Sequence, residues 1–167
     1  FFLAGSGFAV LAIALWICAL NGLLGSWQPT GGWLAWHRHE LLFGFGVAII
    51  AGFLLTAVQN WTGQPGLSGK PLMALASLWL AARIGWLINL PLPLLLPLDS
   101  IFLLLFAALM AEQLWRVRQK NNYPIVAVLL LLAGANGLLL YGLANADDGL
   151  QRQAAYAALW LVATLMG

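Results

Sequence analysis

The sequence predicts an all-α fold, a polytopic transmembrane helical bundle, and three observations support this prediction. The 167 residues are 63% hydrophobic, with a mean hydropathy of +0.92. Only 7% of them are charged, whereas soluble domains are about 25% charged. Long apolar runs recur along the chain, separated by short segments rich in Gly, Pro and Asn. The runs do not alternate polar and apolar residues, as the strands of a membrane barrel would.

Five of these runs are long enough to be full spans, and a sixth is truncated. The full spans are predicted over Phe2–Leu24, Trp36–Trp61, Pro71–Leu90, Leu94–Trp115 and Pro124–Ala144. The sixth begins near Ala154 and reaches Gly167, which is too short for a span of about 20 residues. We therefore expect residues 1–167 to form a single transmembrane helical domain whose chain continues beyond Gly167.

Charge and cysteine content exclude several classes of function. The formal net charge is only +2 and the basic residues are dispersed, so no nucleic-acid partner is expected. The single cysteine, Cys18, excludes an internal disulfide and a cysteine-clustered metal site. The sequence contains no nucleotide-binding loop, serine-nucleophile constellation or zinc-peptidase helix. The partner that the composition itself requires is the lipid bilayer.

The distribution of lysine and arginine predicts the orientation of the bundle, because cytoplasmic loops carry an excess of basic residues. The second and fourth connections hold four basic residues, which are Lys70, Arg116, Arg118 and Lys120. The first and fifth connections hold only two, Arg38 and Arg152. We therefore expect the second and fourth connections in the cytoplasm and residues 37–40 at the outer face. In a Gram-negative cell that face is periplasmic.

The most informative segment is Trp36-His37-Arg38-His39-Glu40, at the head of the second span. Ionisable groups at or below a bilayer surface cost several kcal/mol unless they are paired or solvated, so they are candidates for function. Imidazole is the commonest ligand for protein-bound metals. We predict a metal or haem site near one membrane face, with His37, His39 and Glu40 as candidate ligands. The competing interpretation is that these residues only anchor the helix at the lipid headgroups.

The conformation of residues 36–39 decides how the two histidines can act. Successive helical residues turn by about 100°. In a helix that includes residue 37, the two rings therefore point about 200° apart and cannot bind one metal. If the segment is not helical, His37 and His39 could chelate a single copper or zinc ion. Glu40 could then be a ligand, a partner of His37 or a proton acceptor.

Small residues below this segment predict close helix packing. Gly44, Ala48 and Gly52 recur every four residues, a pattern that lets membrane helices approach one another closely. Gly46 lies beneath His39 and would leave room for a flat macrocycle, although an ordinary helix contact explains it equally well.

Polar residues in the later spans also need partners. Arg83 lies deep in the third span, where an unpaired arginine costs about 2.5 kcal/mol or more. It is expected to face the bundle and to reach Glu40, a backbone carbonyl or a haem propionate. Asn136 is expected to bridge helices, and Asp99 to mark a solvated loop end.

Two stretches of the chain resemble signatures of the NnrS family. Residues 36–44 read WHRHELLFG and are similar to the signature WHxHEMxFG. Residues 51–63 read AGFLLTAVQNWTG and resemble AGFLLTAVPNWTG, with Gln59 in place of the usual proline. The opening Phe1-Phe2-Leu3 matches the end of the family's FRPFFL element. The later spans match only in hydropathy and order.

The resemblance implies a bacterial inner-membrane protein of about twelve spans that contains haem and copper, of which residues 1–167 would be the N-terminal half. It also implies a role in nitric oxide metabolism or resistance to nitrosative stress in denitrifying bacteria, with a gas such as nitric oxide as ligand. His37, His39 and Arg83 are then candidate haem-binding residues, and His37, His39 and Glu40 candidate copper ligands. Enzymatic activity stays open.

Two other classes of function remain as alternatives. A transporter or metal-delivery protein could use residues 37–40 as a transient metal site. An accessory subunit could instead pack its helices on a respiratory complex, with the histidines merely interfacial. The missing C-terminal half or a membrane partner subunit would complete any centre that needs further ligands.

Overall fold

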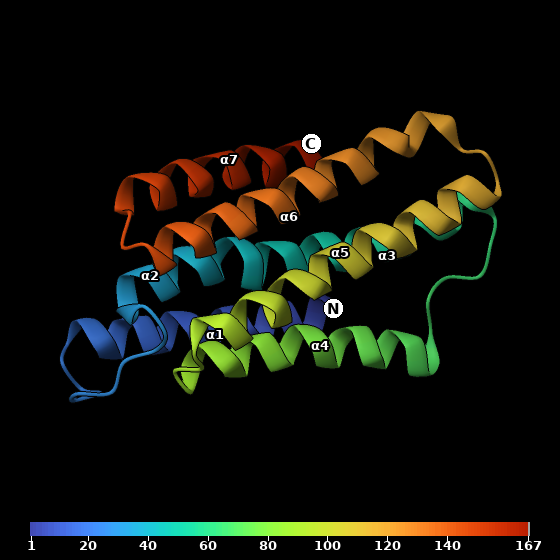
Figure 1. Ribbon diagram of the computed structural model, residues 1–167. Helices are drawn as coiled ribbons and strands as arrows, with labels where there is room; N and C mark the ends of the chain where they lie inside the picture. The colour runs from blue at the N-terminus through green and yellow to red at the C-terminus, as the bar shows by residue number, and fades with distance from the viewer. Residues whose placement is uncertain (167) are drawn as a thin grey trace.

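The computed structural model describes residues 1–166, and all regular structure in this part of the chain is helical (Figure 1). The helices of the first half are α1 (Phe2–Leu20), α2 (Gly32–His39), the π-helix η1 (Glu40–Gly46), α3 (Val47–Thr62) and α4 (Gly69–Leu87). Those of the second half are α5 (Leu92–Arg116), the short 3₁₀ helix η2 (Lys120–Asn122), α6 (Tyr123–Ala144) and α7 (Asp148–Met166). The predicted all-α fold is confirmed.

The axes of the long helices are roughly aligned, and successive helices run in opposite directions (Figure 1). Figure 1 shows the connections after α1, α4 and α6 at one end and those after α3 and α5 at the other. The chain passes straight from α2 through η1 into α3, so these three elements form one long helix over Gly32–Thr62. We call this long helix the second span.

Four of the described helices are long and apolar enough to cross a bilayer, and they cover Phe2–Leu20, Gly32–Thr62, Leu92–Arg116 and Lys120–Ala144. The protein is therefore a helical membrane protein, while the count of five full spans stays a prediction. The predicted third span corresponds to α4, which contains Lys70 and Arg83. The last helix begins at Asp148, earlier than the expected Ala154, because its polar first turns are also helical.

The second span is the centre of the bundle and α1 lies at its edge. In the most apolar stretch of the second span 72% of the residues are buried, against 11% in α1. The small-residue ridge predicted from the sequence does contact another helix. A side chain at Gly5 of α1 would lie 3.1 Å from the Ala48 Cβ, and one at Gly52 would lie 3.2 Å from the ring of Phe2. Close approach of α1 therefore depends on these small residues.

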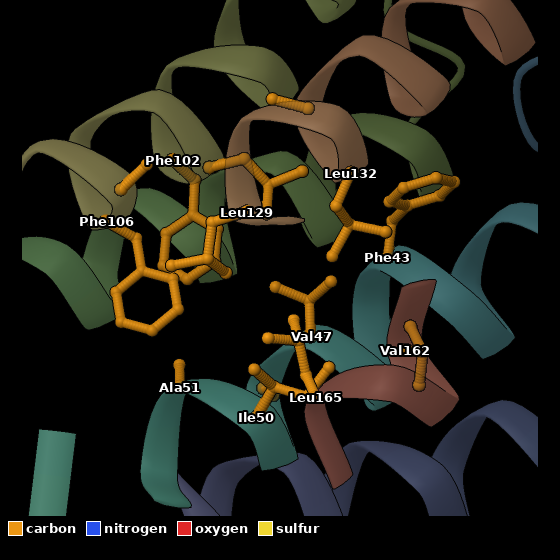
Figure 2. Close-up of a cluster of buried hydrophobic side chains, with 14 of the residues drawn as sticks. Phe43, Val47, Ile50, Ala51, Phe102, Phe106, Leu129, Leu132, Val162 and Leu165 are labelled. Atoms are coloured by element: carbon orange, nitrogen blue, oxygen red, sulfur yellow. The ribbon is translucent and has the colours of Figure 1, made fainter. Parts of the chain in front are cut away.

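The core that follows residues 36–40 along the second span is built from apolar side chains. Figure 2 shows side chains of the second span meeting those of α5, α6 and α7; the labelled residues are Phe43, Val47, Ile50, Ala51, Phe102, Phe106, Leu129, Leu132, Val162 and Leu165. Gly46 faces this packing, since a Cβ there would lie 3.8 Å from a Val162 methyl group. The space beneath His39 is therefore an ordinary contact with α7.

Candidate functional site: a buried ion network and a histidine beside an apolar pocket

His39 is completely buried at the junction of α2 and η1. Its Nδ1 lies 3.1 Å from Glu40 Oε1, and its Nε2 lies 2.8 Å from Asp99 Oδ2 and 2.9 Å from Asn136 Oδ1. All three partners are acceptor oxygens, so both ring nitrogens are placed to donate. The face of the imidazole packs 4.3 Å from the Trp86 ring, centroid to centroid. His39 thus has the surroundings of an imidazolium between two carboxylates.

Arg83 of α4 pairs with the same two carboxylates that contact His39. Its Nε lies 3.0 Å from Glu40 Oε2 and one terminal nitrogen bonds Asp99 Oδ1. Asn136 donates to the other oxygen of Asp99 at 2.9 Å. With an imidazolium at His39, two cations face two carboxylates and the cluster is neutral, as burial of charge requires. We call His39, Glu40, Arg83, Asp99 and Asn136 the ion network.

The ion network joins four segments of the bundle at similar depth. At a rise of 1.5 Å per residue, its members lie about 6–12 Å from the ends of their helices. His39 is seven residues beyond Gly32, Asp99 is seven beyond Leu92, and Asn136 is eight before Ala144. Each member is at most 4% exposed. The predicted contact of Arg83 with Glu40 is confirmed, and so is the helix-bridging role of Asn136.

The expectation that Asp99 marks a solvated loop end is wrong. Asp99 is buried and belongs to the ion network, because α5 begins at Leu92 and places it two turns inside the helix. Its position within a predicted span was a signal in itself, since intramembrane carboxylates are rare and normally paired. The sequence alone did not identify its partners, because they lie 16, 37 and 60 residues away along the chain.

The π-helix η1 was not predicted, and side chains of α4 complete its backbone hydrogen bonding. Arg83 donates to the Phe43 carbonyl at 2.9 Å and the Trp79 indole donates to the Gly44 carbonyl at 3.0 Å. Both hydrogen bonds are buried. Backbone groups without partners are costly in the apolar interior of a membrane. The π-helix η1 therefore depends on two side-chain donors, Trp79 and Arg83, that lie four residues apart on α4.

Replacing Trp79 with phenylalanine is expected to reduce the free energy of unfolding by about 1–3 kcal/mol, because the buried Gly44 carbonyl loses its side-chain donor. The aromatic contact with Phe8 is retained in this variant. Denaturant unfolding in micelles and hydrogen exchange of the η1 amides would measure the effect. A matched control is Trp33→Phe, which removes an exposed bond to the Trp27 carbonyl. Equal losses in the two variants would contradict the role given to Trp79.

His37 lies on the opposite side of the second span from His39. Its ring stacks on Trp16 of α1, with centroids 4.3 Å apart and planes within 9°. Among the described residues this ring is held by stacking rather than by hydrogen bonds. It also lines a pocket of about 160 Å³ between α1 and the second span. His37 is therefore the histidine whose ring borders a cavity.

The helical geometry decides between the two alternatives for the histidine pair. Residues 32–39 are α-helical, so the alternative in which both rings chelate one metal does not hold. His39, Glu40 and Arg83 lie together in the ion network, whereas His37 is apart from them on the α1 side. Their assignment as haem or copper ligands stays a prediction.

The donor atoms around His37 fit only part of a metal centre. Within residues 1–166, no group of three or more His, Cys, Asp or Glu side chains is arranged to hold a metal ion. The pocket beside His37 is smaller than the about 300–1,000 Å³ typical of sites that enclose a drug-sized ligand, so it does not enclose a haem. His37 can supply one bond to a metal at the edge of the bundle. His39 could supply one only by giving up its hydrogen bond to Glu40 or to Asp99.

Comparison with known proteins agrees with the sequence signatures. The family model described as NnrS protein matches residues 1–167, which is the whole chain. No curated protein and no solved structure matches it. Since the family match extends over the later helices as well as the first two spans, the chain belongs to the NnrS family.

Proposed function

We propose that this protein binds haem and copper in the bacterial inner membrane and acts in nitric oxide metabolism or resistance to nitrosative stress. Family membership supports the biological role. The observation that carries the site is the position of His37. Its imidazole is held by Trp16 at the wall of an apolar pocket, and it is the histidine of this chain that can bind a metal without breaking the ion network.

In this proposal the His37 imidazole would hold iron or copper through one nitrogen, and the metal would supply the chemistry that binds a small gas. The remaining ligands come from a membrane partner subunit or from the other half of a larger protein. Stacking on Trp16 fixes the plane of the His37 imidazole, so its ring nitrogens would be oriented by the protein itself. The ion network holds the start of η1, and with it the turn that carries His37.

The basic residues support an outer location for this site. Lys70, Arg116, Arg118 and Lys120 lie at or near the end of the bundle that holds the connections after α3 and α5. At the opposite end, Arg38 and Arg152 both pair with Asp148, at 2.9 Å and 3.5 Å. The positive-inside rule places the first end in the cytoplasm. The His37 end would then face the periplasm.

Replacing His37 with alanine is expected to lower the haem or copper content of the purified full-length protein, because the metal loses a ligand. Absorption spectra of oxidised and reduced samples, with metal analysis of the same samples, would measure this. Leu41→Ala is the matched control, since it enlarges the same pocket and keeps the imidazole. Unchanged stoichiometry in His37→Ala would overturn the ligand assignment. A featureless spectrum of folded protein from haem-replete cells would instead favour a transporter or accessory subunit.

A further inference from the structure

We infer that the pocket between α1 and the second span is a binding site for a small, neutral, apolar molecule that enters from the bilayer. The pocket holds about 160 Å³. Beside His37 and Glu40, its walls are the apolar side chains of Ala9, Ala12, Ile13, Leu41 and Phe45. This inference rests on the proposed function where it places the bound molecule next to a metal on His37, but the pocket itself needs no metal.

The size and lining of the pocket indicate the class of ligand. An engineered cavity of about 150 Å³ with an apolar lining stays dry and binds benzene or xenon. A buried water needs two to four polar partners, and apart from His37 and Glu40 every residue that lines this pocket is apolar. Water therefore gains little in this pocket. A neutral molecule no larger than benzene fits its volume and its chemistry.

The rim of the pocket faces the lipid. Ile13 and Leu41 are 56% and 55% exposed, whereas Glu40 on the inner wall is 1% exposed. Both rim residues belong to helices that can cross a bilayer, so their exposed faces meet acyl chains. A molecule arriving by this route must first dissolve in the membrane, which selects against ions and strongly polar solutes.

The α1 wall makes the route passable. Most of α1 is exposed, with 11% of its apolar stretch buried, and two of its three residues at the pocket are alanines. Small movements of this helix cost few contacts. On the inner side His37, whose ring stacks on Trp16, lines the pocket, so a bound molecule would lie beside this residue. The pocket thus connects the bilayer with the proposed metal ligand.

Xenon is a suitable probe, and the test uses the full-length protein in nanodiscs with labelled isoleucine methyl groups. The Ile13 methyl signal is expected to shift with xenon pressure and to saturate, because the pocket has a limited capacity. Ile17, one turn further along α1 and 53% exposed to lipid, is expected to shift linearly as xenon dissolves in the bilayer. A linear response at Ile13 would overturn the inference. This is also the response expected if lipid acyl chains already fill the pocket.

Ala12→Leu is expected to abolish the saturable shift, because the added side-chain atoms occupy the pocket. Ala9→Leu fills it from the next turn and provides a second variant if the first does not fold. Ala14→Leu adds the same atoms to the lipid-facing side of α1 and should leave saturation unchanged. Saturation that survives both filling variants would overturn the inference. Xenon binding needs no metal. A purified protein that shows saturation but contains neither haem nor copper would therefore support the pocket and contradict the proposed function alone.

Discussion

Replacing Arg83 with methionine is expected to lower the free energy of unfolding by about 3–5 kcal/mol, the cost of removing one partner from a buried ion pair. Glu40 and Asp99 are 1% and 4% exposed, so water cannot replace the guanidinium without opening the bundle. The Phe43 carbonyl loses its donor in the same variant. The methionine retains apolar bulk, so the loss reports on charge and hydrogen bonding more than on a cavity. Unfolding in micelles with rising SDS content would measure it.

Arg116→Met is the matched control, because it removes the same kind of side chain from the exposed pair with Glu112. Such surface pairs contribute no more than about 1 kcal/mol. The double variant Arg83→Met, Asp99→Asn leaves one cation, His39, facing one carboxylate, Glu40. We expect it to be less destabilised than the sum of its single variants, since residues of one network are not additive. If Arg83→Met and Arg116→Met have equal effects, the ion network does not stabilise the bundle.

Replacing Gly44 with alanine is expected to destabilise the protein by about 1–3 kcal/mol through overpacking. A Cβ at this position would overlap the Glu40 carboxylate and would lie 2.8 Å from the Phe8 ring. Neither neighbour can move freely, because Glu40 is hydrogen-bonded to His39 and ion-paired with Arg83, and because Phe8 packs on Trp79. The methyl group must therefore displace α1, the carboxylate or both. Thermal and SDS unfolding would both detect the loss.

Gly137→Ala on α6 is the control for this substitution. A Cβ at Gly137 meets no atom within 4 Å, and alanine is the better helix former by about 1 kcal/mol. The control is therefore expected to be neutral or slightly stabilising. Hydrogen exchange in α1 should rise in Gly44→Ala and stay unchanged in Gly137→Ala. A Gly44→Ala protein as stable as the control would show that α1 is not packed closely at this point.

The sequence predicted part of the candidate site correctly. Arg83 was expected to reach Glu40 because both are ionisable groups in an apolar protein and must find partners. His37 and His39 were singled out for the same reason. Asp99 was misplaced, because its burial depends on where α5 begins and on which helices surround it. The π-helix η1 escaped prediction because its donors, Trp79 and Arg83, lie on a different helix.

The sequence by itself determined that the protein is a bundle of apolar helices, where the central long helix lies, and that the segment from His37 to Glu40 is unusual. These features follow from local composition and period, which a single segment carries. Only the tertiary structure decided that His39 is enclosed by Glu40, Asp99 and Asn136 while His37 borders a pocket. The reason is physical: a buried charge is stabilised by whichever opposite charge the fold brings within about 3 Å, and helices distant in sequence supply it.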